Sequence, residues 1–108
     1  MSDLIRRQLY FFHLYTGTSR TQRRALLSTL TRSQLRALSE VAHNVVRGII
    51  PLTKAEIYQL RVYKHVLIKL GDKRYVHKRK LMHGRQDVIL TLLKAALSYL
   101  KPLMTEST

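Results

Sequence analysis

The sequence predicts an all-α fold, a small bundle of five or six short helices joined by tight, capped turns. Three segments, beginning at Ser19, Thr31 and Thr53, have the S/T-x-x-E/Q pattern of a helix capping box. Apolar residues after these starts recur at the spacing of one helix face. Clean two-residue alternation bounded by turns is absent from the sequence, so a strand is conceivable only around 74–76.

Six helices are expected in order along the chain. We place them at about 3–15, 20–30, 32–47, 54–70, 76–83 and 87–100. Gly48, Gly71 and Gly84 fall where helices should end, because glycine tolerates the left-handed conformation common just after a helix. We expect residues 1–103 to form a single basic helical domain and 104–108 a frayed tail, since 108 residues suit one domain.

The expected helices at 32–47 and 54–70 have clear polar faces. In the first, Arg36, His43 and Arg47 lie opposite the apolar face. In the second, basic residues recur at i, i+4 and i+8 and predict a positive stripe along one helix. The stripe consists of Arg61, His65 and Lys69.

Charge is the strongest indication of function. The chain has 20 Lys and Arg against 6 Asp and Glu, a net charge of +14, and Asp72 is the only acid between Arg61 and Arg85. Like charges at this density disfavour a compact state unless a polyanion neutralises them. Hydrophobic residues make up 45% of the chain, which argues against a disordered polycation.

The segment from 61 to 85 therefore predicts a nucleic-acid-binding surface. Lys and Arg at this density bind phosphates with release of counterions, which makes binding sequence-independent and sensitive to salt. The candidate residues are Arg61, Lys64, His65, Lys69, Lys73, Arg74, Lys78, Arg79, Lys80 and Arg85. DNA is favoured over RNA, and a sequence-specific helix-turn-helix regulator is an alternative.

Three tyrosines lie among these basic residues and suit either packing or stacking on bases. Tyr63 falls on the apolar helix face and is more typical of a core residue. For Tyr58 and Tyr75 both interpretations stay open.

The sequence does not indicate a reaction, a metal or a cofactor. Asp3, Glu56 and Asp87 suit helix N-termini, and the motifs of phosphate loops and zinc proteases are absent. The histidines of the basic segment lack cysteine or acidic partners at ligand spacing. We expect no enzymatic activity, no small-molecule substrate, no cofactor and no metal site.

The last helix predicts self-association. Residues 88–100 are apolar around more than half of a helix circumference, and such a helix is buried in a core or covered by a partner. Because small domains bury little surface, we expect a homo-oligomer formed through Leu90, Leu93, Leu97 and Leu100. Insertion into a membrane interface is a second interpretation, although the run is shorter than the roughly 20 residues that span a bilayer.

An intracellular protein is expected rather than a secreted one. The start Met-Ser-Asp lacks the basic-then-apolar order of a secretory signal, and the absence of cysteine excludes a disulfide framework. The cluster Lys78-Arg79-Lys80 is also of the type that directs proteins to the nucleus.

Positions between about 23 and 84 also match a known pattern. They are Ala25-Leu26-Leu27, Gln34-Leu35, Ala37-Leu38, Glu40, His43-Asn44, Gly48, Pro51-Leu52-Thr53, Leu60 and Lys78-Arg79-Lys80. In these residues the chain resembles small basic proteins of Polinton-like and adintovirus-like double-stranded DNA elements. Many of those proteins continue into Gly-Gly-Phe-Leu, whereas Arg-Gln-Asp follows Gly84 here.

The resemblance implies a virion or genome-associated role. Together with the basic charge, it leads us to expect a self-associating viral or mobile-element protein that associates with the genome or condenses it, located in the host nucleus and the virion. The alternative is a structural virion or capsid-associated protein, docked through its apolar N-terminal and C-terminal helices.

Overall fold

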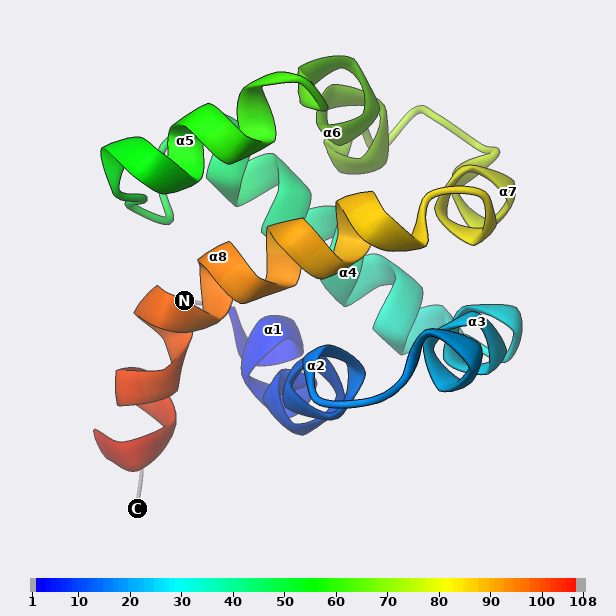
Figure 1. The fold of residues 1–108 in the computed structure, drawn as a ribbon, viewed down its shortest axis with the longest axis horizontal. Coiled ribbons are helices and arrows are strands. Elements are labelled where there is room, and N and C mark those ends of the chain that lie inside the picture. The colour runs from blue at the N-terminus through cyan, green and yellow to red at the C-terminus, as the bar shows by residue number, and fades with distance from the viewer. Residues whose placement is uncertain (1, 107–108) are drawn as a thin grey trace.

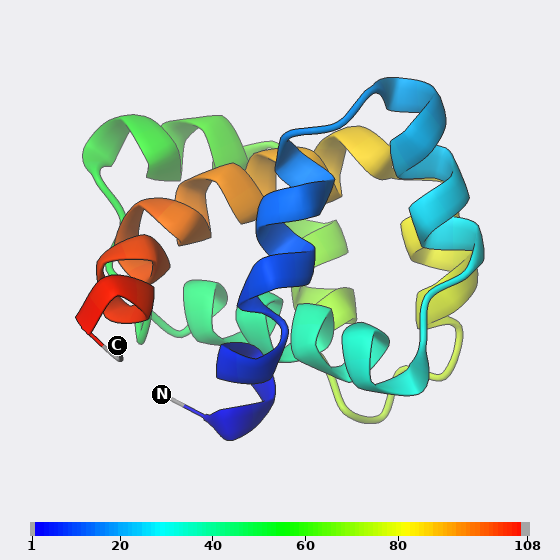
Figure 2. The ribbon, with the colours of Figure 1, turned by 90° about the horizontal axis from the view of Figure 1, so that it is seen from below.

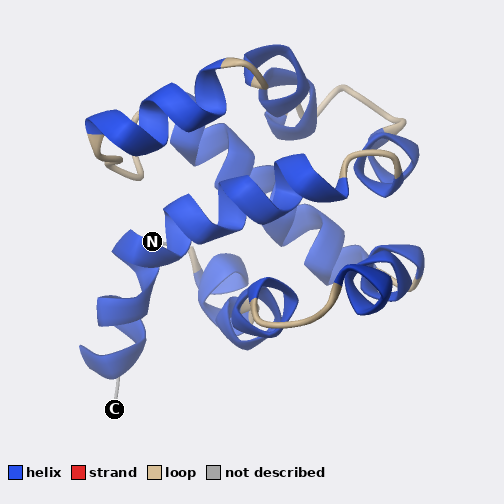
Figure 3. Ribbon diagram, in the orientation of Figure 1, coloured by secondary structure: helices blue, strands red, loops and turns tan. Residues whose placement is uncertain are grey.

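The computed structural model describes residues 2–106, which form eight helices, and five of the first seven pack against the last one (Figure 1). The helices are α1 (Asp3–Arg7), α2 (Leu9–Thr16), α3 (Arg20–Ser28), α4 (Arg32–Val46), α5 (Lys54–Arg61), α6 (Lys64–Gly71), α7 (Lys78–His83) and α8 (Gln86–Glu106). Among these residues there is no strand, including at 74–76 (Figure 3). The all-α class is confirmed, but five or six helices was too few.

The additional helices arise because two expected helices are each divided. The segment 3–15 breaks at Gln8, and the segment 54–70 breaks at Val62 and Tyr63. Beyond the second break the chain changes direction, so that α5 lies in the plane of Figure 1 and α6 is seen end-on. The turn lets α5 pack on α8 while α6 packs on α4. Arg61 therefore ends one helix and His65 lies on the next, and the expected continuous stripe was wrong.

The three predicted capping boxes are present. The hydroxyls of Ser19, Thr31 and Thr53 accept hydrogen bonds from backbone amides three residues on, at 3.1–3.2 Å. In each box the side chain three residues on accepts in return from the capping residue's own amide. These local contacts satisfy amides that have no partner within the helix, which is why the starts of α3, α4 and α5 were predictable.

The three glycines serve different purposes from one another. Gly48 has a φ of +75°, the left-handed conformation expected after a helix. Gly84 follows α7 with a φ of −85° and does not use that freedom. Gly71 is the last residue of α6, and a Cβ there would lie 2.8 Å from the backbone of His43 on α4. Glycine is therefore required at position 71 because α6 and α4 pack too closely there for a side chain.

The central position of α8 explains its apolar circumference. It packs against α2, α3, α4, α5 and α7, and Figure 1 shows α4 behind it and other helices on either side of it. The packing of α2 on it can be followed in Figure 2. Leu93 and Leu100 are fully buried, Leu97 is 4% exposed and Leu90 is half-buried. The expectation that the chain's own helices could not cover this helix was wrong, because many short helices surround it. Leu93, Leu97 and Leu100 are therefore not available to contact a second copy in this fold, and Leu90 offers only part of its side chain. The homo-oligomer stays a prediction that these buried leucines do not support.

The apolar N-terminal helices are also part of the core. Leu9, Phe11 and Phe12 on α2 are buried, together with Ile5 on α1, while Tyr10 points outward at 75% exposure. The buried residues of the apolar N-terminal run are therefore not available to dock a partner in this fold. Only the exposed face of α2, which carries Tyr10, could contact one.

The C-terminal end of α8 continues further than expected. The helix extends through Glu106 and contains Pro102, and its direction changes near this end in Figure 1. Proline lacks the amide that an interior helical position uses, which accounts for a kink. The predicted frayed tail at 104–108 is helical as far as Glu106, and its last two residues, 107–108, lie outside the described residues. In the described part of the chain, no helix combines the length and hydropathy needed to cross a membrane.

Candidate nucleic-acid interface

The candidate cations are carried by four consecutive parts of the chain. Arg61 ends α5, three residues lie on α6, two lie on the segment from 72 to 77 that joins α6 to α7, and the rest lie on α7 or just after it. We call the joining segment the 72–77 loop. Every candidate is exposed except Lys78, which is partly buried.

A cleft near these residues lies between α4 and the 72–77 loop. It has a volume of about 630 Å³, and we call it the α4 cleft. Its cations are Arg36, Lys73 and Lys78, and its apolar residues include Leu35 and Val76. The remaining lining residues are Leu4, Ser39, Glu40, His43, Asn44, Gly71 and Tyr75. The loop and the polar face of α4 thus combine cations from distant parts of the sequence.

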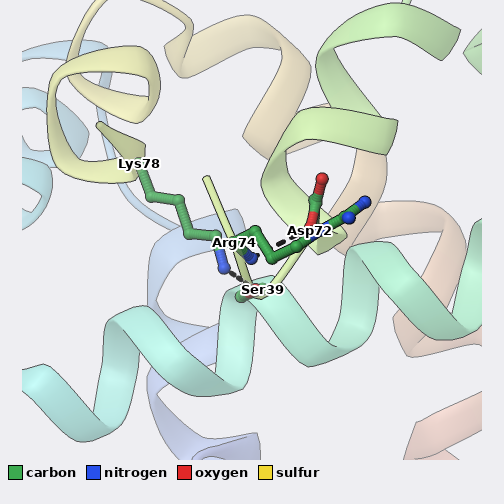
Figure 4. Close-up of polar contacts among 4 residues, drawn as sticks. All are labelled: Ser39, Asp72, Arg74 and Lys78. Carbon is green, nitrogen blue, oxygen red and sulfur yellow. Dashed lines mark hydrogen bonds and ion pairs between the residues drawn. The ribbon is translucent and has the colours of Figure 1, made fainter. Parts of the chain in front are cut away.

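Lys78 is held in this cleft by a buried serine (Figure 4). The Lys78 Nζ donates to Ser39 Oγ at 2.8 Å, and Ser39 Oγ donates to the carbonyl oxygen of Leu70 at 2.6 Å. The pair joins α7 to α4 and to the end of α6. Burial lowers the pKa of Lys78 and nearby Lys73 lowers it further, whereas the Asp72 carboxylate acts in the opposite direction. Lys78 is therefore an oriented ammonium group rather than a mobile surface cation.

The only acid of the basic segment is engaged by its own loop. Asp72 Oδ1 accepts from the backbone amide of Arg74 at 2.9 Å and lies 3.4 Å from Arg74 Nε. The hydrogen bond from the Arg74 amide is the main reason that the pKa of Asp72 is lowered. Within the described residues of the site, Arg74 is the only cation with a carboxylate at ion-pair distance.

A second group of candidates, from α6, α7 and the segment between α7 and α8, lies near Tyr75. Lys69 Nζ lies 5.9 Å from the centre of the Tyr75 ring, and the His77 ring meets Tyr75 edge-on at 6.0 Å. Tyr75, Lys80 and Arg85 line a cleft of about 420 Å³. Tyr75 also lines the α4 cleft, so it lies between the two groups of cations.

Four further nucleic-acid-binding candidates lie outside these two groups of cations. The Arg79 guanidinium donates to the carbonyl oxygen of Leu30 at 2.7 Å and so joins α7 to the turn before α4. Arg61, Lys64 and His65 are exposed near the junction of α5 and α6 and do not line either cleft described above. In the Lys78-Arg79-Lys80 cluster, the first two residues thus make tertiary hydrogen bonds. Lys80 makes none among the described contacts.

Sequence reasoning missed the contribution of α4. Arg36 and His43 line the α4 cleft, and Arg47 lines a neighbouring cleft of about 580 Å³ together with Lys73 and Arg74. The signal was available in part, because these three residues share one polar face of the helix. What the sequence did not contain was the position of the loop over that face.

Of the three tyrosines, Tyr58 is 74% exposed on α5, and Tyr63 is half-buried and packs against the core. Among the described residues, no group of three or more His, Asp or Glu side chains is arranged to hold a metal ion. Comparison of the chain with protein-family models, with curated proteins and with solved structures finds no match.

Proposed function

We propose that this protein is a non-enzymatic nucleic-acid-binding protein that holds phosphate backbones, mainly without reading sequence. One observation carries the proposal. Five cations of the segment from 61 to 85 are exposed, and none of them has a carboxylate at ion-pair distance in the described part of the chain: Arg61, Lys64, Lys69, Lys80 and Arg85. Unpaired cations at this density favour a polyanionic partner, because each phosphate contact releases counterions.

DNA is the polymer we favour, and genome condensation in a virus or mobile element is the role. The resemblance to small basic proteins of double-stranded DNA elements supports DNA as the polymer and an association with the genome. The net charge of +14 supports condensation, because it would neutralise phosphates of either polymer. A virion protein that docks through apolar end helices has less support, because Phe12 on α2 and Leu93 on α8 lie in the core.

The proposal is tested by binding to duplex DNA across a salt series, from about 50 to 200 mM. The informative variant replaces four exposed cations by glutamine and leaves Lys78 and Arg79 intact, since those two residues make tertiary hydrogen bonds. The substitutions are Lys69→Gln, Lys73→Gln, Lys80→Gln and Arg85→Gln. If all four contact phosphates, the slope of log affinity against log salt should become shallower by about 3 to 4.

The control removes the same charge from other exposed cations on α1, α3, α5 and α8. Its substitutions are Arg6→Gln, Arg20→Gln, Lys54→Gln and Lys94→Gln. We expect the control to retain most of the slope of the unmodified protein. Weak binding with a flat slope in the unmodified protein, or equal losses in the two variants, would contradict the proposal.

A further inference from the structure

The α4 cleft has features that a phosphate-binding surface alone does not require. Besides cations, its lining includes Leu35 and Val76, and Val76 is 82% exposed in the middle of a basic loop. The volume of about 630 Å³ lies within the range of roughly 300–1,000 Å³ typical of sites for small organic ligands. The cleft is therefore suited to a ligand that has both an apolar part and an anionic part.

The anionic part has a prepared partner in Lys78. An ammonium group has three N–H donors, and Ser39 accepts one of them at 2.8 Å. Two donors are left for a ligand, and Lys73 adds a second positive charge to the same cleft. Because the Ser39 contact already orients the Lys78 side chain, little side-chain freedom remains to be lost on binding. Burial lowers the pKa of Lys78, and an anion at this position would offset that effect.

The apolar part has a partner in the 72–77 loop. Tyr75 and Val76 are adjacent on the loop and both line the cleft. Aromatic side chains bind unpaired bases by stacking, whereas the bases of a duplex present only their edges. Glu40 and Asn44 on α4 line the same cleft and supply acceptor and donor groups for a base edge.

We propose that the α4 cleft binds one unpaired nucleotide of a nucleic-acid strand, with its phosphate at Lys73 and Lys78 and its base against Tyr75 and Val76. This inference rests on the proposed function and adds to it a preference for strand ends, gaps or single strands. Lys69, Lys80 and Arg85, outside the α4 cleft, would then serve duplex and single strand alike.

The test compares an oligothymidylate with a blunt duplex that has the same number of phosphates, by fluorescence anisotropy at one salt concentration. Tyr75→Leu keeps an apolar side chain but removes the stacking ring, and we expect about five-fold or greater loss of oligothymidylate affinity. Val76→Ser changes a residue that is 82% exposed, so the fold should tolerate it, and it should weaken the same complex several-fold. Duplex affinity should change by less than about two-fold in both variants.

A matched control is available in Val62. It is 78% exposed at the junction of α5 and α6 and does not line the α4 cleft. Val62→Ser should leave both affinities unchanged. Equal losses on both probes, or no loss on either, would overturn the cleft site.

Amide chemical shifts supply a second measurement on the unmodified protein. Oligothymidylate should shift the signals of residues 72–77, and inorganic phosphate at the same concentration should shift them much less. Equal shifts would mean that phosphate alone is recognised and would overturn the base contact.

The failures of the two proposals are distinguishable. If the protein binds duplex with a steep salt slope but the cleft variants bind oligothymidylate normally, only the cleft inference is wrong. If the unmodified protein binds neither probe, the proposed function is wrong as well.

Discussion

Gly71 on α6 and His43 on α4 meet so closely that a single methyl group added to the glycine would lie 2.8 Å from the His43 Cα. The two helices pack together at this point, and α6 continues directly into the 72–77 loop, which lines the α4 cleft opposite the polar face of α4. The position of the candidate interface thus depends on the absence of a side chain at one residue.

Replacing Gly71 by alanine should therefore destabilise the fold. The added Cβ meets backbone atoms, which cannot rotate away, and overpacking of this kind costs about 1–3 kcal/mol. Urea unfolding measures the loss as a lower midpoint at an unchanged slope. Gly84→Ala is the control, because its Cβ would have no neighbour closer than 3.9 Å and its φ of −85° suits alanine. A Gly71→Ala protein as stable as the control would show that the helices can separate without cost.

Arg79 and Lys80 are neighbours with opposite expected phenotypes. Arg79→Ala removes the hydrogen bond to the Leu30 carbonyl oxygen and should lower the unfolding free energy by about 1–2 kcal/mol. Lys80→Ala should change stability by less than about 0.5 kcal/mol, because the residue is exposed. In a DNA titration the Lys80 variant should bind more weakly and with a shallower salt slope. The reverse assignment of the two phenotypes would contradict the placement of these side chains.

Tyr15 should make stability depend on alkaline pH. Its ring is fully buried, and its hydroxyl donates to the carbonyl oxygen of Gln86 at 3.1 Å. Burial raises the pKa of Tyr15 from 10.0 to about 12, with a smaller contribution in the same direction from Asp87 and an opposing one from Arg23.

Because the folded protein binds this proton more tightly, the contribution to stability is complete below pH 10 and is lost as the pH rises to about 12. The loss should approach about 1.4 kcal/mol per pH unit between those values. Tyr15→Phe should remove this part of the slope and cost about 0.5–1.5 kcal/mol at neutral pH. Identical alkaline unfolding profiles of the two proteins would contradict the prediction.

Leu93 should behave as a core residue rather than as an interface residue. It is fully buried on α8, so Leu93→Ala should lower the unfolding free energy by about 2–5 kcal/mol. Lys94→Ala, an exposed neighbour on the same helix, should have an effect within about 0.5 kcal/mol. Calorimetry and sedimentation separate the two interpretations. A Leu93→Ala protein of normal thermal stability but altered association state would place Leu93 at an interface.

Much of the secondary structure was predictable because its causes are local. The boxes at Ser19, Thr31 and Thr53 involve residues three apart, and their hydrogen bonds depend on little beyond the turn itself. The breaks at Gln8 and Tyr63 were missed because helical periodicity continues across them, and only packing on different partner helices requires the change of direction.

The sequence allowed us to predict most of the cations of the candidate interface, but not how they are arranged in space. The sequence located the cations, yet it did not distinguish Lys80 from Arg79, which serves the fold through Leu30. It also gave no reason to group Arg36 with Lys73, since the two residues are far apart in the chain and meet only across the α4 cleft.

The sequence by itself determined the all-α class, the starts of three helices and an excess of positive charge, because each follows from neighbouring residues or from composition. The tertiary structure decided the use of each side chain. Leu93 became core because other helices surround α8, and Lys78 became an oriented donor because Ser39 lies opposite it on α4. Both outcomes depend on contacts between residues distant in the chain, which local patterns do not encode.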